Sequence, residues 1–342
     1  MLLPRTTRHR QELHRLARTM LLATALAAPL TALAQTAAAP LVLEAKIPLG
    51  PVSGRIDHLG VDVKRQRLFV AELGNNSLGV VDLAAGKVLR TIGGFREPQG
   101  VAYVPFADSV YVANAGDGSV RVLSGNDLAP IGRIELGDDA DNVRVDEPRH
   151  RVLVGYGSGA LAVIDPATNS KVGEIPLAGH PESFRIDETG SQVFVNVPDA
   201  HEITVVDLVA AGSQSLPDQG AGANFPMAID RDGRRVLVVF RSPPMLMALS
   251  SQDGHLVART TTCNDADDLF VDARRRRVYV SCGEGAVDVF AAEEAGYRRL
   301  ARVHTVSGAR TSLFVPERNR LYVAVRARWT EPSTIWVFRP AP

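Results

Sequence analysis

The chain has 342 residues, 45% of them apolar, so it can bury a large core as one repeat domain or as two ordinary domains. Its 38 Lys and Arg balance its 38 Asp and Glu, which excludes a global electrostatic attraction to nucleic acid. The 29 Gly and 21 Pro are spread along the chain and favour many short strands over long helices.

The first 34 residues have the features of a secretory signal. Residues 1–19 contain five Arg and one Glu, and the apolar stretch Met20–Ala34 ends in the cleavage pattern Ala32-Leu33-Ala34. An uncleaved membrane anchor is the alternative, but this stretch is short for a span of about 20 residues. We expect a cleaved signal at 1–34, a short linker at 35–40 and a periplasmic or secreted protein without a transmembrane span after cleavage. Residues 35–342 then carry a net charge of −4.

Seven related segments follow along the rest of the chain. Each ends in an apolar strand and an anchor residue, and the anchors are Asp62, Val104, Asp146, Asp187, Asp230, Asp272 and Pro316. Successive anchors are 42, 42, 41, 43, 42 and 44 residues apart. A fixed period in this range is the signature of a repeat architecture.

Each repeat contains four predicted strands. A polar turn follows the anchor, then a strongly β-prone strand such as "RLFVA", a Gly- or Asn-rich link, a third strand such as "LGVVDL" and a fourth such as "KVLRTI". The fourth repeat has only the Gly-rich "GSQSLPDQGAGANFP" for its last strand, and the seventh has none. We therefore predict an all-β, seven-bladed β-propeller at 41–342, whose ring is closed by the N-terminal strand Leu41–Leu49.

The segments "RLFVAELGNNSLGVVDLAAGKVLRTI" and "SVYVANAGDGSVRVLS" resemble the YVTN-type β-propeller repeats of secreted bacterial and archaeal proteins. The resemblance covers about 41–340, and its nearest short form is "YVAN" at Tyr111–Asn114. It implies the fold, but that family includes surface-layer proteins and partner-binding modules, so it does not decide the function.

The loops that enter the innermost strands should share one face of the ring, around the mouth of the central channel. Polar residues stand five and seven positions before the anchors, and others lie beside them. The candidate ligand-binding residues at this mouth are Asp57, His58, Glu97, Gln99, Asp139, Asp141, Asn142, His180, Glu182, Asn224, Asp265, Asp267, Asp268 and Arg310. Carboxylates crowded at one mouth need raised pKa values, basic partners or a bound cation.

Three interpretations of this acidic mouth remain open. In the first, its side chains accept backbone hydrogen bonds and tie neighbouring blades together. In the second, the mouth binds a small molecule or a protein partner, with a calcium or other divalent ion held by Asp141, Glu182, Asn224 and Asp267. In the third, the ion polarises a lactone or ester carbonyl for hydrolysis. The residue types are similar to those of gluconolactonase-like propellers, but that family has six blades and this chain seven.

The opposite face should be basic, because the hairpins between first and second strands contain Arg clusters such as Arg274–Arg277. These clusters would either be solvated hairpin tips or contact an anionic surface. They lack interleaved aromatic residues, so we expect no nucleic-acid partner.

Two cysteines, Cys263 and Cys282, form either one disulfide or two buried thiols. From the sequence we expect a secreted binding module, with a metal-dependent lactonase or esterase as the alternative and a structural cell-surface protein as the second alternative.

Overall fold

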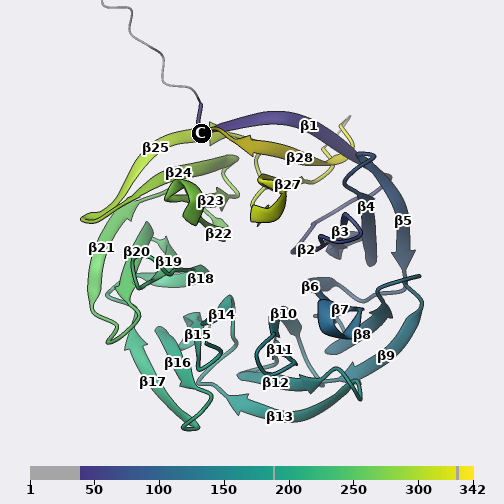
Figure 1. Ribbon diagram of the computed structural model, residues 1–342, viewed down its shortest axis with the longest axis horizontal. Coiled ribbons are helices and arrows are strands. Elements are labelled where there is room, and N and C mark those ends of the chain that lie inside the picture. Colours follow the sequence, from purple (N-terminus) through teal and green to yellow (C-terminus); the bar gives the residue numbers. More distant parts are fainter. Residues whose placement is uncertain (1–38, 188, 329–330) are drawn as a thin grey trace, which may run out of the picture. The chain divides into compact units, whose positions relative to one another are not determined.

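The computed structural model describes residues 39–187, 189–328 and 331–342. Their strands form seven antiparallel sheets of four strands each, arranged radially in a closed ring (Figure 1). The predicted seven-bladed β-propeller is therefore confirmed. The predicted signal peptide, 1–34, lies outside the described residues and stays a prediction. Among the described residues, no helix is long and apolar enough to cross a membrane.

In each blade, the first strand lies next to the central channel and the fourth lies at the outer edge. Blade one contains β2 (Leu59–Asp62), β3 (Arg67–Glu72), β4 (Ser77–Asp82) and β5 (Lys87–Gly93). Blade two contains β6 (Pro98–Val104), β7 (Ser109–Asn114), β8 (Ser119–Ser124) and β9 (Pro130–Glu135). Blade three contains β10 (Ala140–Asp146), β11 (Arg151–Tyr156), β12 (Ala160–Asp165) and β13 (Ser170–Pro176).

The remaining blades follow the same order. Blade four contains β14 (Phe184–Ile186), β15 (Gln192–Val197), β16 (Glu202–Asp207) and β17 (Gly212–Pro217). Blade five contains β18 (Gly222–Asp230), β19 (Arg235–Ser242), β20 (Pro244–Ser250) and β21 (Leu256–Thr261). Blade six contains β22 (Ala266–Asp272), β23 (Arg277–Cys282), β24 (Ala286–Glu293) and β25 (Gly296–His304). Blade seven contains β26 (Ser312–Val315), β27 (Arg320–Val325), β28 (Ser333–Pro340) and β1 (Leu41–Gly50).

The N-terminal strand closes the ring, as the sequence predicts. Strand β1 pairs antiparallel with β28, with Leu41 opposite Pro340 and Ile47 opposite Ile335. The pairing covers an edge of β28 that would otherwise expose unpaired backbone groups. The doubtful fourth strand of blade four is also present as β17, which pairs along its length with β16.

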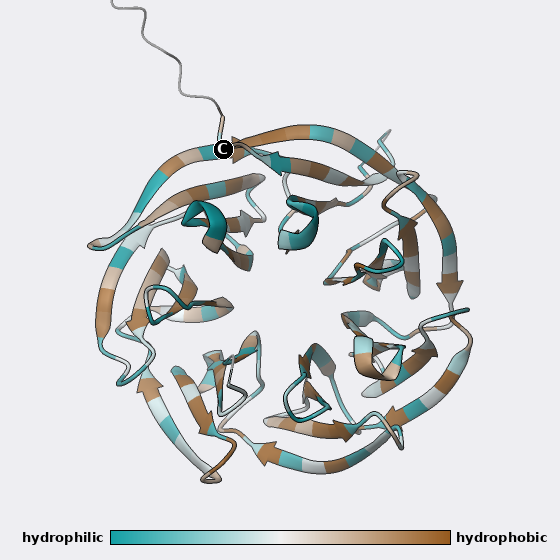
Figure 2. Cartoon of the chain, in the orientation of Figure 1, coloured by the Kyte–Doolittle hydropathy of each residue, from teal (hydrophilic) through white to brown (hydrophobic). Residues whose placement is uncertain are grey.

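The apolar core lies between the faces of adjacent blades. One cluster joins Val104 and Tyr111 of blade two to Val152 and Val154 of blade three, and the others repeat this pattern around the ring. The second strands are buried almost throughout because they lie inside their sheets with a neighbouring blade on each face. The outermost strands alternate between apolar and polar residues, as Figure 2 shows, because one of their faces meets solvent.

The hairpin arginines tie blades together, a role that the sequence did not predict for them. Arg67 at the start of β3 donates to the main-chain oxygens of Gly125 and Asn126 in the next blade. Likewise, Arg277 of blade six donates at 2.6 Å to the main-chain oxygen of Ala341, which follows β28 of blade seven. Charge-assisted hydrogen bonds of this kind hold the long side chains against the neighbouring blade. These arginines are therefore engaged within the ring, which leaves fewer of them for an outside anionic surface.

The structure joins Cys263 and Cys282 by a disulfide, with their Cα atoms 5.9 Å apart. Cys263 precedes β22 and Cys282 ends β23, so the bond staples the first hairpin of blade six. Both residues are buried in the cluster between blades five and six.

Candidate functional site

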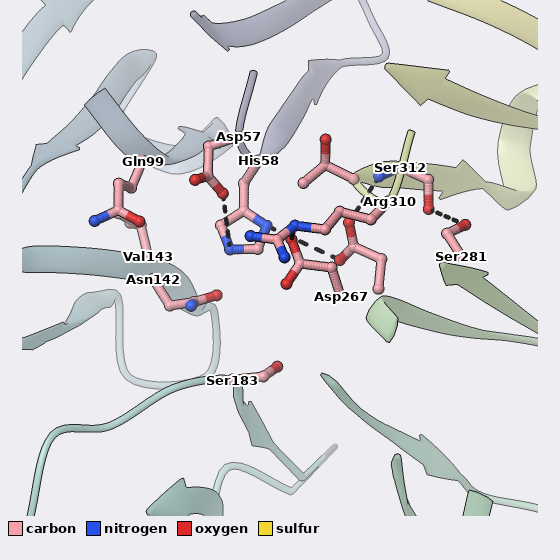
Figure 3. Close-up of polar contacts among 12 residues, drawn as sticks. Asp57, His58, Gln99, Asn142, Val143, Ser183, Asp267, Ser281, Arg310 and Ser312 are labelled. Atoms are coloured by element: carbon pink, nitrogen blue, oxygen red, sulfur yellow. Dashed lines mark hydrogen bonds and ion pairs between the residues drawn. The ribbon is translucent and has the colours of Figure 1, made fainter. Parts of the chain in front are cut away.

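Two of the predicted mouth residues, His58 and Asp268, line a central cavity of about 930 Å³. Close contact between blades depends on a glycine in β6, because a Cβ at Gly100 would overlap the main-chain oxygen of Asp141. Asp141 can therefore lie at the mouth only because blade two presents no side chain there. Figure 3 shows residues from several blades, among them Asp57, Asn142 and Asp267, gathered around the opening.

His58 lies between two carboxylates from different blades. Its Nε2 is 3.7 Å from an oxygen of Asp57 (Figure 3). Its Nδ1 is 3.9 Å from an oxygen of Asp268. Burial lowers the pKa of His58, but attraction to Asp57, Asp268 and Asp141 outweighs it, so the net shift is upward. The other Asp268 oxygen accepts a hydrogen bond of 2.7 Å from the main-chain nitrogen of Ser312, which ties blades six and seven together.

Two arginines neutralise Asp267. Nη2 of Arg241 in blade five is 2.5 Å from one Asp267 oxygen, and Nε of Arg310 in blade seven is 3.1 Å from the other. Arg310 also donates to Asp265 at 2.7 Å. The guanidinium of Arg241 stacks 3.5 Å above the ring of Phe225, which fixes its position. Arginines of the protein therefore already neutralise the charge of Asp267.

In blade one, Arg55 neutralises Asp57. Its Nη2 donates to Asp57 at 2.5 Å and to the side-chain oxygen of Gln99 at 3.3 Å. Gln99 in turn donates to Asp139 at 3.5 Å, so a chain of polar contacts runs along the rim from blade one to blade three. His180 accompanies Asp139, with Nδ1 3.9 Å from its carboxylate and 2.6 Å from the main-chain oxygen of Gly157.

Among the described residues, Asp141 forms no ion pair, unlike Asp57 and Asp267. Asp141 is only 6% exposed, and its Oδ1 has no hydrogen-bond partner in the described part of the chain. Burial raises the pKa of Asp141 to about 6, with repulsion from Asp57 and Asp139 adding to the shift, whereas His58 and His180 oppose it. A buried carboxyl group with an unpartnered oxygen is costly, and a bound cation or donor would relieve that cost.

Two further carboxyl groups at the mouth also have raised pKa values. Burial raises the pKa of Glu182 to about 7, and Asp141 and Asp267 raise it further by repulsion. Burial also raises the pKa of Asp268 to about 7, although His58 attracts its charged form. Three carboxyl groups from blades three, four and six therefore titrate near neutral pH around one opening, which is typical of functional sites.

Other predicted residues are less involved in the mouth. Glu97 is exposed and, like Asp139 and Asp265, has a left-handed backbone conformation in its loop. Asn224 donates to Asn196 and to the main-chain oxygen of Glu202 in blade four, so it ties blades four and five. This contact is of the kind that the blade-stitching interpretation expects. The Oδ1 atom of Asn224 is nevertheless buried without a partner.

The residues predicted from the sequence did not include two arginines that line the channel. Arg144 of β10 and Arg185 of β14 line the central cavity three positions after Asp141 and Glu182. The signal was present in the anchor strands, which read "VRVD" and "FRID" where the other blades have small or apolar residues at the same position. Alternation along a strand directs such a residue toward the channel.

The metal hypothesis rests on residue types. The described ranges contain no group of three or more His, Cys, Asp or Glu side chains arranged to hold a metal ion. Of the four predicted ligands, Asp267 is paired with arginines, whereas Asp141 and Asn224 each have an unpartnered oxygen. A divalent ion at this mouth stays a prediction.

Comparison with known proteins supports the fold. The sequence matches no protein-family model and no curated protein. Among solved structures, the chain is similar to a Kuenenia stuttgartiensis hydrazine synthase chain, with a TM-score of 0.69 and 17% identity over 84% of this chain and 95% of that one. It is also similar to a chain of a mitotic checkpoint complex, with a TM-score of 0.77 and 13% identity over 94% and 99%. These neighbours are seven-bladed propellers; they do not confirm the resemblance to YVTN-type repeats or gluconolactonase-like proteins.

Proposed function

We propose that this protein is a binding module of the YVTN-repeat type, which holds a small ligand at the channel mouth through a cationic group. The observation that carries the proposal is Asp141, a buried carboxyl group whose Oδ1 has no partner. Glu182 and Asp268 supply further carboxyl groups with raised pKa values at the same opening. A cation placed among them would favour their charged forms and offset the cost of burying them.

The arginine pairs at the rim explain which part of the mouth is open to a ligand. Asp57 and Asp267 already contact guanidinium groups at 2.5 Å, so they shape the opening and hold the blades. Asp141 is the carboxylate left for an outside cation. An organic ammonium group fits this description, and so does a divalent ion that bridges a ligand, because carboxylate and amide oxygens suit calcium.

Calorimetric titration with putrescine and, separately, with calcium chloride tests this proposal at pH 8, where the three carboxyl groups are mostly ionised. We expect at least one probe to bind, and Asp141→Asn to weaken it ten-fold or more. The matched control is Asp253→Asn, which alters an exposed turn carboxylate that contacts His255. Equal affinity in wild type and Asp141→Asn, or no binding of either probe, would contradict the proposal.

A metal-dependent hydrolase at the same mouth is the second candidate. The unpartnered oxygens of Asp141 and Asn224 favour it, because both are hard ligands of the type that holds calcium in such sites. Calcium-dependent turnover in a panel of lactones and esters, abolished by chelation and by Asn224→Ala, would support this candidate. Putrescine binding with no turnover of any substrate would favour the binding module.

We further propose that the mature protein is periplasmic or secreted and begins after residue 34. The features that support this are the basic and apolar segments of 1–34 and the disulfide between Cys263 and Cys282, since such bonds persist in oxidising compartments. Mass spectrometry of the exported protein tests it: an N-terminus at Gln35 is expected, and an intact N-terminal segment would argue for an anchor.

A further inference from the structure

The channel below the mouth has a cationic wall that the proposed function does not use. Arg144 and Arg185, on the inner strands of blades three and four, line the cavity of about 930 Å³. Both donate to one acceptor, the main-chain oxygen of Phe184, at 3.1 Å from Nε of Arg144 and 2.9 Å from Nη1 of Arg185. Two guanidinium groups therefore stand side by side on the channel wall.

Neutral groups hold both arginines in place. Arg144 also donates to the main-chain oxygen of Val143 at 2.8 Å and to the side-chain oxygen of Asn142 at 2.6 Å. Arg185 donates to the Ser183 hydroxyl at 3.2 Å. Among the contacts of the described residues, Arg185 uses only Nη1, so its Nε and Nη2 donors remain free. The pair is fixed by the protein but keeps donors for something else.

In the described part of the chain, neither arginine forms a direct ion pair. Asp268 attracts both guanidinium groups across the channel, and Asp141 attracts that of Arg144, but Asp268 already contacts His58 and the main chain of Ser312. Burial and repulsion from Arg185 lower the pKa of Arg144, and attraction to Asp268 and Asp141 only partly offsets them. Burial also lowers the pKa of Arg185 to about 10. Buried charges are normally paired, so two adjacent unpaired cations in a cavity indicate that an anion is missing.

The remaining wall of this layer is small or apolar. The equivalent positions in blades one, two and five are Gly60, Ala102 and Ala228, which leave open space, and blade six contributes Phe270. The residues that directly follow these positions in the inner strands, such as Val61 and Val145, also line the cavity. An anionic group on the arginines would therefore have an apolar body beside it, as in most small-molecule sites.

We infer that the channel is a binding site for a small carboxylate with an apolar body. Its carboxylate accepts hydrogen bonds from Nε and Nη2 of Arg185, in the bidentate manner that suits planar carboxylates, and from a second hydrogen on Nη1 or Nη2 of Arg144. Its apolar part occupies the space beside Ala228 and Phe270. This site lies one layer inside the channel and does not depend on the cationic group proposed for the mouth.

Phenylacetate is the probe that tests the inference, with phenylacetamide as its neutral counterpart and acetate and inorganic phosphate as anions without the apolar body. Calorimetry on the wild-type protein should show binding of phenylacetate, at least ten-fold weaker binding of acetate and none of phenylacetamide. Phosphate binding tighter than phenylacetate would overturn the assignment to carboxylates with an apolar body, and no binding of any anion would overturn the site.

Variants then locate the site. Arg185→Gln should weaken the binding of phenylacetate at least ten-fold. The control is Arg90→Gln, which should leave that binding unchanged, because Arg90 is an exposed residue of β5 that donates to a turn carbonyl. Asp141→Asn should leave phenylacetate binding unchanged or tighter, so failure of the mouth proposal would not be confused with failure here. If Arg185→Gln does not fold, a crystal of the wild-type protein soaked in phenylacetate decides: a carboxylate in contact with both arginines is expected, and one bound elsewhere would overturn the inference.

Discussion

Asp141 and Asp267 occupy equivalent positions in blades three and six, yet Asp267 is paired with arginines and Asp141 is not. Nη2 of Arg241 lies 2.5 Å from Asp267, whereas Oδ1 of Asp141 has no hydrogen-bond partner among the residues that the structure describes. Both stand in a nearly repeated sequence, "DADN" and "DADD". The two repeats therefore contain similar carboxylate loops, but neighbouring blades supply cations to only one of them: Asp267 helps to hold the ring together, and Asp141 is the residue that we propose contacts a ligand.

The first prediction concerns pH. The raised pKa values of Asp141, Glu182 and Asp268 mean that the folded protein binds protons more tightly than the unfolded chain between about pH 4 and pH 7. Stability must therefore fall as pH rises through this window, and the raised pKa of His58 acts in the same direction, because its contribution is lost as the imidazole deprotonates. Urea unfolding at pH 5 and pH 8 measures this fall. Asp141→Asn should reduce it by on the order of 2 kcal/mol, and an unchanged fall would contradict the prediction.

The second prediction concerns the paired carboxylate. Arg241→Gln removes a cation from Asp267 and a stacking contact from Phe225, so the free energy of unfolding should drop by about 1–3 kcal/mol. The matched control is Arg298→Gln, whose partner Glu293 is at the surface; a change of about 0.5 kcal/mol or less is expected there. Chemical denaturation of both variants at pH 7 provides the comparison, and equal effects would show that the mouth pair has no special role.

Ring closure leads to the third prediction. On β1, Ile47 is 4% exposed and packs into the cluster between blades seven and one, whereas Leu43 on the same strand is 40% exposed. Ile47→Ala should cost about 2–4 kcal/mol, because it leaves a cavity in that cluster. Leu43→Ala should cost about 0.5 kcal/mol or less, as surface substitutions usually do. Similar costs for the two variants would indicate that β1 does not pack as described.

The fourth prediction concerns the disulfide. Cys263 and Cys282 are 19 residues apart in sequence, and a loop of this size is expected to stabilise the fold by about 3 kcal/mol through the unfolded chain. The double variant Cys263→Ala, Cys282→Ala should show that loss in urea unfolding. In the wild type, reducing agent should produce a similar loss, while the double variant should be insensitive to it. Sensitivity of the double variant to reducing agent would count against this explanation.

The fold could be predicted from the sequence because its signals are local and repeated. Strand alternation and the spacing of about 42 residues indicated seven blades, and the apolar stretch at Leu41–Leu49 indicated the closing strand. Counting back five residues from each anchor also found Asp57, Asp141 and Asp267, because equivalent loops of a propeller meet at one mouth.

The partners of those residues could not be predicted in the same way. Arg241 reaches Asp267 from another blade, and nothing near Asp141 in the sequence shows that it lacks such a partner. Arg144 and Arg185 were visible in the inner strands, but the sequence did not show that they share an acceptor. Nor did it show that neither forms a direct ion pair with another described residue. The hairpin arginines were likewise visible as a basic face, whereas their contacts with the next blade were not.

The most direct test of the mouth as a cation site is the titration of its two histidines. Carboxylates there raise the pKa of His58, and they add to the effect of the Gly157 main-chain oxygen in raising that of His180. A cation bound among the carboxylates should therefore lower both pKa values. NMR titration of the imidazole signals, assigned with His58→Gln and His180→Gln, measures these pKa values with and without putrescine or calcium. We predict that a bound probe lowers both pKa values in wild type and neither pKa value in Asp141→Asn. Values that do not respond to either probe in the wild-type protein would contradict the account.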